Sequence, residues 1–424
     1  MKRFSQFVGA LGVVAFLCGA SFAEERVYRD GNSWVQELTG SLAGAKLLKV
    51  KVEMGGVRIQ GGNPEGIRYT VHNRVYVSSE KEARRMFERY HISSGSNGQA
   101  AWLKGDWEGS SPRKFLAEFV FEVPRELENV KVETAGGEVS ASDLAGNVTS
   151  ASGGGNVHFG VIGGSVAVET GGGNVDVKHA GGSLSVSTGG GNVDLGEVGG
   201  GAAVETGGGN IHLASAGGPV SIETGGGNIH TGPCKGEMKA STGGGLIDLG
   251  DIKGPVTIDT GGGSIRLLSA GGLVHAESGA GQLDLGRISD GIRAETGGGG
   301  ITAQFVSGSL RTDSTLETPA GDIILYLSSD VHATVRAAIE VAQGHRITSD
   351  FPEIRITSEG SDWGPKTYIA EGRINGGGPV LKIRTTTGNI ELRRLNHYWE
   401  NRNEQSIFDS GSVGASIALY SGRR

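Results

Sequence analysis

Residues 170–187 read Thr-Gly-Gly-Gly-Asn-Val-Asp-Val-Lys-His-Ala-Gly-Gly-Ser-Leu-Ser-Val-Ser, and this 18-residue pattern repeats through the middle of the chain. A Thr or Ser before a glycine-rich cluster marks each copy, every 18 residues, at Thr134, Ser152, Thr170, Thr188, Thr206, Thr224, Thr242, Thr260, Ser278 and Thr296. Ten copies in one uninterrupted register indicate a repeat architecture, in which each copy stacks on its neighbours.

Each copy carries two short alternating segments, when its residues are numbered from the Thr. Apolar residues fall at positions 6 and 8 (Val175, Val177) and at positions 15 and 17 (Leu184, Val186). Such alternation predicts two strands per copy with one face turned inward, and the glycine clusters between them predict corners. The predicted fold class is therefore all-β: a single-stranded, right-handed β-solenoid of about 18-residue turns with two short strands per turn.

Position 11 is apolar in every copy and is predicted to point inward at a corner: Leu144, Ile162, Ala180, Val198, Ala216, Cys234, Ile252, Ala270, Ile288 and Val306. Cys234 is then a core residue and not a nucleophile or ligand. Position 9 is usually glycine where position 11 is large, and it is Lys178, Ala214 or Leu268 where position 11 is alanine. This covariation predicts that the two positions share a fixed interior volume.

The two ends of the chain depart from the repeat. Lys2 and Arg3, a short apolar run over residues 8–17 and small residues before a cut after Ala23 are typical of a signal peptide. Ser79, with Glu82 three residues later, predicts the start of a helical insertion that would cover an open solenoid end. The predicted segments are a signal peptide (1–23), N-terminal strands and cap with the helix (24–133), the solenoid (134–327), a C-terminal insertion and closing turn (328–395) and a flexible tail (396–424).

Composition limits the classes of partner. Removal of Lys2 and Arg3 with the signal peptide leaves 37 basic against 46 acidic residues, which argues against nucleic acid and against an anionic membrane bound by charge alone. No later stretch is apolar and long enough to span a membrane. Cys234 is the single cysteine after cleavage, so no internal disulfide is expected. We expect an extracytoplasmic protein, in the periplasm, on the cell surface or secreted.

Two outward columns contain candidate site residues. At position 7, Asp194, His212, His230 and Asp248 fall on consecutive copies and have the residue types that bind transition metals. The alternative, which we favour, is that they are ordinary polar residues between two inward ones, so no metal and no cofactor is predicted.

At position 18 an acidic column forms a possible binding-face ladder of Glu169, Glu205, Glu223, Asp259, Glu277 and Glu295. Carboxylates about 5 Å apart on adjacent copies could share a hard cation. The favoured alternative is a solvated face that keeps the repeat soluble. The Thr column and the Asn column at position 5 are expected to satisfy corner backbone groups.

The order of these parts resembles a known family. The features are a strand pair over residues 50–59, a strand ending at Val123-Pro124, the Thr-Gly-Gly-Gly-Asn-Val/Ile repeats, and a closing Thr387-Gly-Asn-Ile-Glu-Leu392. Across residues 45–395 they resemble the bacterial putative adhesin family, a domain of unknown function with β-strand repeats. The resemblance implies a surface or envelope protein, and it specifies architecture more than activity.

The predicted function is that of a non-catalytic, exported, adhesin-like protein that binds a glycan, a protein or an envelope component. The alternative is a β-helix carbohydrate-active enzyme, a polysaccharide lyase or hydrolase, which needs two or three carboxylates on one face. The two differ in where the non-repeating polar residues lie. An enzyme would gather them in one groove, whereas a binding protein would leave them scattered at the ends.

Overall fold

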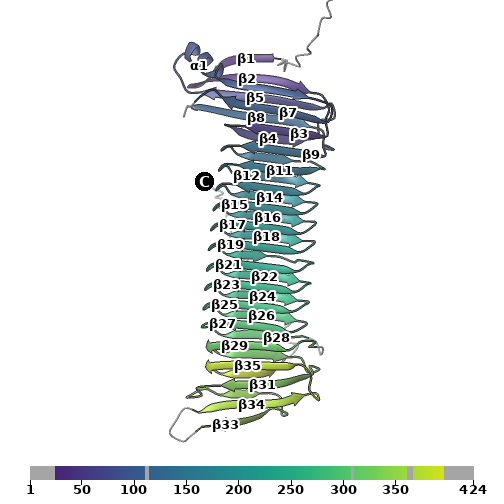
Figure 1. The fold of residues 1–424 in the computed structure, drawn as a ribbon, viewed down its shortest axis with the longest axis vertical. Helices are drawn as coiled ribbons and strands as arrows, with labels where there is room; N and C mark the ends of the chain where they lie inside the picture. Colours follow the sequence, from purple (N-terminus) through teal and green to yellow (C-terminus); the bar gives the residue numbers. More distant parts are fainter. Residues whose placement is uncertain (1–23, 110–113, 307–309, 361–365, 396–424) are drawn as a thin grey trace, which may run out of the picture. The chain divides into compact units, whose positions relative to one another are not determined.

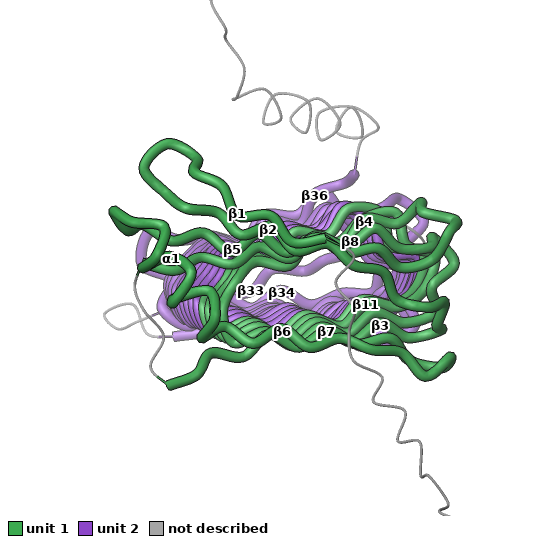
Figure 2. Tube along the Cα trace, turned by 90° about the horizontal axis from the view of Figure 1, so that it is seen from above, with its two compact units in different colours: residues 1–172 green, residues 173–424 purple. Residues whose placement is uncertain are grey.

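The structure is a computed structural model that describes residues 24–109, 114–306, 310–360 and 366–395. The predicted signal peptide and tail lie outside these residues. The described chain is built almost entirely of strands, with one helix (Figure 1). It divides into two compact units, residues 1–172 and 173–424, which are coloured separately in Figure 2 and described one at a time here.

Unit 1 contains two sheets and the helix α1 (Glu80–Phe87). Its sheet A consists of β1 (Glu24–Asp30), β2 (Ser33–Leu42), β4 (Gly56–Gly61), β5 (Ile67–Val75), β8 (Phe115–Val123), β10 (Val139–Ser142) and β12 (Val157–Ile162). Its sheet B consists of β3 (Leu47–Val52), β6 (Tyr90–Ser96), β7 (Ala100–Trp107), β9 (Asn129–Thr134), β11 (Asn147–Ser152) and β13 (Val166–Thr170).

The first turn of unit 1 is not the outermost one. β3 pairs in parallel with both β7 and β9, and β4 pairs in parallel with both β8 and β10. The chain therefore makes the β3–β4 turn, builds the β7–β8 turn on its outer side, and returns to continue the stack on its inner side. Three antiparallel strands then extend sheet A: β5 pairs with β8, β2 with β5, and β1 with β2.

The cap of unit 1 combines the predicted helix with a cluster of aromatic rings. The Ser79 hydroxyl accepts a hydrogen bond from the Glu82 backbone N–H at 3.3 Å, so the predicted N-cap is confirmed. Aromatic side chains pack together beside the helix, with the ring centroids of Tyr90 and Trp107 4.9 Å and 4.7 Å from that of Phe115. Burial of these large rings stabilises the end that would otherwise expose the solenoid core.

Unit 2 likewise has two sheets. Its sheet A consists of β14 (Val175–Ala180), β16 (Val193–Val198), β18 (Ile211–Ala216), β20 (Ile229–Thr231), β22 (Ile247–Ile252), β24 (Ile265–Ala270), β26 (Leu283–Ile288), β28 (Ile301–Phe305), β30 (Ile323–Leu327), β32 (Ile347–Ser349) and β36 (Ile390–Arg394). Its sheet B consists of β15 (Leu184–Thr188), β17 (Ala202–Thr206), β19 (Val220–Thr224), β21 (Met238–Thr242), β23 (Val256–Thr260), β25 (Val274–Ser278), β27 (Ile292–Thr296), β29 (Ser314–Ala320), β31 (Ala333–Ile339), β33 (Arg355–Glu359), β34 (Thr367–Ile374) and β35 (Val380–Thr387).

Neighbouring turns of unit 2 pair in parallel, with each residue opposite the one 18 positions later. Leu195 lies opposite Leu213 on sheet A, and Val204 lies opposite Ile222 on sheet B. The offset then becomes 22 residues, because Glu295 lies opposite Glu317. The all-β architecture with two parallel sheets is thus confirmed, and the register of the repeat shifts after Thr296.

The closing turn of unit 2 is also enclosed by its insertion. β35 pairs in parallel with β29 and β31 and lies between them in Figure 1. β36 pairs in parallel with β30 and β32. Residues 328–379 therefore form a turn on the outer side of the one that follows them in sequence. β34 pairs antiparallel with β31, and β33 pairs antiparallel with β34.

The inward column at position 11 is largely as predicted. Cys234 is 1% exposed and has no disulfide partner. The prediction is wrong for Val306, which is only half-buried. The β26–β28 register shifts before Ile288, so that Phe305, 1% exposed, lies opposite Ile288 and fills the corner instead.

The shared interior volume predicted for positions 9 and 11 is wrong. Lys178 and Ala214 at position 9 point outward and are exposed. Glycine is needed at this position because of close backbone approach: a Cβ on Gly196 would lie 2.0 Å from the Lys178 carbonyl oxygen, and one on Gly232 would lie 2.0 Å from that of Ala214.

The Thr and Asn columns satisfy corner backbone groups, as predicted. Buried Thr206 donates its hydroxyl to the Gly191 carbonyl at 2.9 Å and accepts from the Gly209 N–H at 3.3 Å. The Asn192 backbone N–H donates to the Asn174 side-chain oxygen one turn earlier, at 2.9 Å. These bonds join adjacent turns at the corners, where strand pairing is interrupted.

Candidate functional site

The four predicted position 7 residues form a continuous row on sheet A of unit 2. His212 Nδ1 lies 3.0 Å from Asp194 Oδ1, and His230 Nδ1 lies 3.3 Å from Asp248 Oδ2. The two imidazole rings stack, with centroids 5.3 Å apart and planes at 4°. The hydrogen bond that the His230 ring donates to the Asp248 carboxylate raises the pKa of His230, against the opposite effect of its partial burial.

This stack separates the row into two acid–histidine pairs. Each histidine is oriented by its own carboxylate, and the four side chains do not converge on one point. Within the described ranges, no group of three or more His, Cys, Asp or Glu side chains is placed to hold a metal ion. The row is therefore arranged as polar surface that couples two histidines to two carboxylates.

The position 18 column lies on the outer face of sheet B in each unit. Glu169 is exposed on β13 of unit 1, and the other five members lie in unit 2. Glu205 is directly opposite Glu223, and Glu277 is directly opposite Glu295. Glu277 also contacts His275, with Oε1 2.7 Å from Nε2. The column is accessible to solvent, and its members lie in a row along the sheet.

A groove of about 400 Å³ opens on sheet A of unit 2, over β20, β22, β24 and β26. Strand β20 stops at Thr231, because Gly232-Pro233 follows and proline has no N–H for the ladder. Position 9 is glycine on two consecutive turns here, Gly232 and Gly250, so no position 9 side chain covers the floor of the groove on these two turns. Leu268 on the next turn gives that floor an apolar patch.

Polar side chains form the two walls of the groove. One wall is the continuation of the position 7 column, with His230, Asp248, Arg266 and Asp284. On the other side Asp251 binds Arg287 from two turns away, with Oδ1 3.0 Å from Nη2. The Ser269 hydroxyl, on the turn between them, donates to the same Asp251 oxygen.

Arg287 is held in an unusual backbone conformation, with φ at 34°. This is the left-handed region, which a residue with a Cβ seldom adopts and which costs about 1–3 kcal/mol. The position coincides with the register shift between Leu285 and Ile288. Strain of this kind is maintained where the surrounding structure requires it, and here it accompanies the contact of Arg287 with Asp251.

The carboxylates of the groove differ in their protonation. Burial raises the pKa of Asp284, and Arg266 beside it acts in the opposite direction. Burial also acts to raise the pKa of Asp251, but hydrogen bonding by Ser269 and the charge of Arg287 outweigh it, and the result is a lowered pKa. The groove therefore contains both charge-compensated ion pairs and one carboxyl group that burial shifts toward its neutral form.

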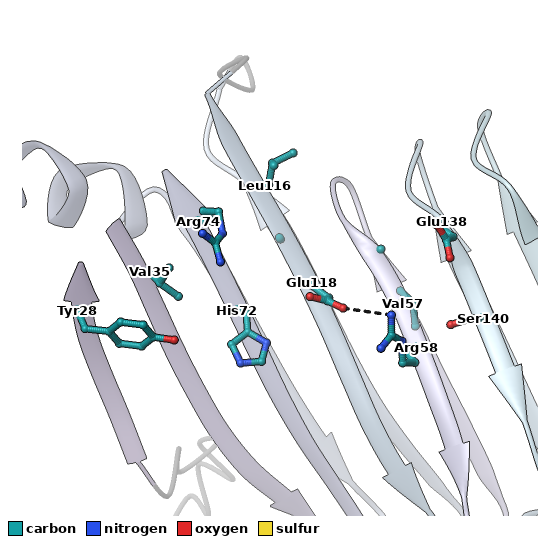
Figure 3. A pocket seen from close by; sticks show the side chains of 12 residues that line it. Tyr28, Val35, Val57, Arg58, His72, Arg74, Leu116, Glu118, Glu138 and Ser140 are labelled. Carbon is teal, nitrogen blue, oxygen red and sulfur yellow. Dashed lines mark ion pairs between the residues drawn. The ribbon is translucent and has the colours of Figure 1, made fainter. Parts of the chain in front are cut away.

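A second hollow, of about 540 Å³, lies on the outer face of sheet A in unit 1. Figure 3 shows its charged side chains on neighbouring strands, with Arg58 Nη2 3.7 Å from Glu118 Oε1. Arg74 binds Asp30 at 2.8 Å and thus has a partner beside the hollow. The exposed ring of Tyr28 lies along one side. This hollow therefore has paired charges beside an aromatic ring.

The sequence located only part of the groove. His230, Asp248 and Asp284 belong to the position 7 column weighed from the sequence, whereas Asp251, Arg266 and Arg287 are not predicted there as parts of a site. The available signals were Pro233 inside a strand and glycine at position 9 on two successive turns, both of which break the pattern of the repeat.

Comparison with known proteins gives remote structural likeness. No family model and no curated protein matches the chain. A solved putative cell adhesion protein from Clostridium sporogenes is 10% identical and covers 85% of this chain and 100% of its own, with a TM-score of 0.20. A putative adhesin from Bacteroides fragilis is 12% identical and covers 69% and 96%, with a TM-score of 0.25.

Both of these solved proteins are described as putative adhesion proteins, which agrees with the family resemblance found in the sequence. A putative lipid binding protein from Parabacteroides distasonis also matches, at 11% identity over 87% of this chain and 98% of its own, with a TM-score of 0.19. At these identities and TM-scores the likeness carries no functional inference for this chain. Among the described residues, no helix has the length and apolar character needed to cross a membrane.

Proposed function

We propose that this protein is a non-catalytic, exported, adhesin-like binding protein with a right-handed β-solenoid fold, and that its ligand is a neutral glycan held in the groove over β20–β26. The observation that supports a binding role most is that the carboxylates Asp248 and Asp251 of this groove are already paired, with His230 and Arg287. Residues that depart from the repeat also gather here, which supports the groove as the site and, taken alone, would favour the enzyme. Arg266 stands in a column of Asp and His, and Arg287 is strained. Regular stacking alone accounts for neither residue.

The chemistry of the groove suits hydroxyl groups. Its three carboxylates, Asp248, Asp251 and Asp284, are balanced by Arg266 and His230 of the lining and by Arg287, which pairs with Asp251. A ligand with a single strong charge would meet groups of both signs in the groove, so the groove favours neither an anionic nor a cationic ligand. A sugar hydroxyl can donate to a carboxylate and accept from a guanidinium at the same time. Leu268 and the glycines of the floor would meet the less polar face of a sugar ring.

The second candidate function is hydrolysis of a glycan in the same groove. Asp248 and Asp284 are two turns apart, which places their Cα atoms about 10 Å from each other. An inverting glycosidase uses two carboxyl groups at a comparable separation, one of them with a raised pKa as general acid. Asp284 has such a shift. Asp248 is already bonded to His230 and Asp251 to Arg287, which favours binding.

A glycan array combined with detection of new reducing ends tests both functions. The groove variants are Asp284→Asn and Arg266→Gln, and the matched controls on sheet B are Asp259→Asn and Arg293→Gln, whose side chains are exposed. We expect array signals that the groove variants weaken about tenfold and the controls leave unchanged, with no reducing ends released. Release that Asp284→Asn abolishes would establish the enzyme instead. Signals insensitive to both groove variants would refute the groove as the site.

A further inference from the structure

An exposed tryptophan lies flat on the outer face of sheet B in unit 1. Trp102, on β7, is 41% exposed and lies opposite Gly95 of β6. A Cβ added to Gly95 would lie 2.9, 3.0 and 3.2 Å from three indole atoms, Cζ2, Cε2 and Nε1. The ring therefore covers the bare Gly95 backbone with one face, and its exposed surface is available for a flat partner.

Lysines continue the same row across the sheet. Lys49 of β3 lies opposite Trp102, and Lys131 of β9 lies opposite Lys49. Lys49 is exposed, and it makes no ion pair with any residue in the described part of the chain. Since adjacent strands are about 4.8 Å apart, the Cα atoms of the two lysines are about 5 and 10 Å from that of Trp102 along the row. The indole itself lies over Gly95, on the other side of β7 from the lysines.

The next row adds two lysines whose charges are partly compensated. Glu133 Oε1 lies 2.8 Å from Lys131 Nζ, and its Oε2 lies 3.2 Å from Lys51 Nζ. These contacts lower the pKa of the Glu133 carboxyl. Lys104 pairs with Asp106 at 2.5 Å. With four lysines and two carboxylates, this face is cationic in a protein that is acidic as a whole.

We propose that this face, defined by Trp102, Lys49, Lys51, Lys104 and Lys131, is a second binding surface that takes an acidic sugar residue of a polysaccharide. The apolar face of the sugar ring would stack on the indole, and its carboxylate or sulfate would bind Lys49 and Lys131. Stacking requires one flat aromatic ring, and the anionic group requires a cation one strand away. The row from Trp102 to Lys131 provides both across neighbouring strands, over the span of a short acidic oligosaccharide.

An anionic bilayer is the main competing partner for a tryptophan among lysines. Membrane binding of this kind needs a substantial apolar area to bury in the interface. Among the described residues on this face, Trp102 is the only exposed large hydrophobic side chain. The others in unit 1 belong to sheet A: Tyr28, Leu116 and Val161 lie on its strands, and Tyr76 directly follows β5. One ring is sufficient for a sugar and insufficient for a lipid surface, so we favour the acidic sugar.

The test is a titration of the whole mature protein with tetragalacturonate, followed by tryptophan fluorescence and calorimetry. Maltotetraose is the neutral control, and phosphatidylglycerol vesicles test the bilayer. We expect tetragalacturonate to bind, with an affinity that falls as salt increases. Trp102→Ala should weaken binding about tenfold and Trp102→Phe less. Lys49→Gln with Lys131→Gln should weaken it and reduce its salt dependence.

Two controls separate this surface from the groove. Lys235→Gln removes an exposed lysine of unit 2, and Asp284→Asn alters the groove; neither should change the affinity for tetragalacturonate. Circular dichroism and the melting temperature show whether each variant is folded. Absence of binding, equal binding by the Trp102→Ala and double lysine variants, or binding to vesicles alone would overturn the proposal. None of these results bears on a neutral glycan in the groove.

Discussion

Replacement of Thr224 by valine removes a hydroxyl that links two turns while keeping the size of the side chain. Thr224 is 2% exposed, donates to the Gly209 carbonyl at 2.8 Å and accepts from the Gly227 N–H at 3.3 Å. Valine leaves both backbone groups without this partner at a buried corner. Because each buried polar group without a partner costs about 1–3 kcal/mol and the second bond is long, we expect a loss of about 2–4 kcal/mol.

Thr224→Ser is the matched control, because the chain itself carries serine in this column. Ser278 donates to the Gly263 carbonyl at 2.8 Å and accepts from the Gly281 N–H at 2.8 Å. The serine variant keeps both bonds and loses one methyl group, which costs about 1 kcal/mol.

The assay is guanidinium unfolding followed by circular dichroism, with hydrogen exchange at the Gly227 amide as a local probe. The valine variant should unfold at lower denaturant than the serine variant, and its Gly227 amide should exchange faster. Equal midpoints for the two variants would refute the role given to the Thr column.

Three further predictions concern pH, thiol reactivity and the unit of the fold. Asp248 raises the pKa of His230, so this pair stabilises the fold fully below pH about 6.5 and less as pH rises through the folded pKa. In the His230→Gln variant the melting temperature should therefore depend less on pH between pH 6 and 8 than it does in the unmodified protein. An unchanged dependence of the melting temperature on pH would contradict this. Burial raises the pKa of Cys234 to about 11, so Ellman's reagent at pH 8 should label it only after unfolding, whereas rapid labelling of the native protein would count against its burial. Deletion of residues 207–224, one 18-residue turn, should preserve cooperative melting, whereas deletion of residues 207–215 should abolish it; equal outcomes would argue against an 18-residue unit.

The parts of the fold that the sequence predicts are those determined within one turn or between adjacent turns. Alternation at Val175 and Val177 already separates inside from outside, and the Thr and Asn columns follow from residues 18 positions apart. The cap at Ser79 is similarly local. Each of these features needs only short-range pattern and the constraint that identical turns stack in register.

The features that escaped prediction depend on distant parts of the chain. The β3–β4 and β35–β36 turns are each enclosed by an insertion. This arrangement is decided by which strand covers the open edge of the stack. Phe305 replaces Val306 at its corner because of a register shift. The wall of the groove joins Asp251 to Arg287, 36 residues later, and the strained backbone of Arg287 has no signature in composition or period.

The most direct test of the account is a crystal structure of the protein soaked with a neutral glycan that the array identifies. The account predicts electron density for a sugar between the two walls of the groove, over Gly250 and Leu268, with hydroxyl groups bonded to Asp284 and Arg266. Density for the glycan elsewhere, with the groove empty at saturating ligand, would contradict it.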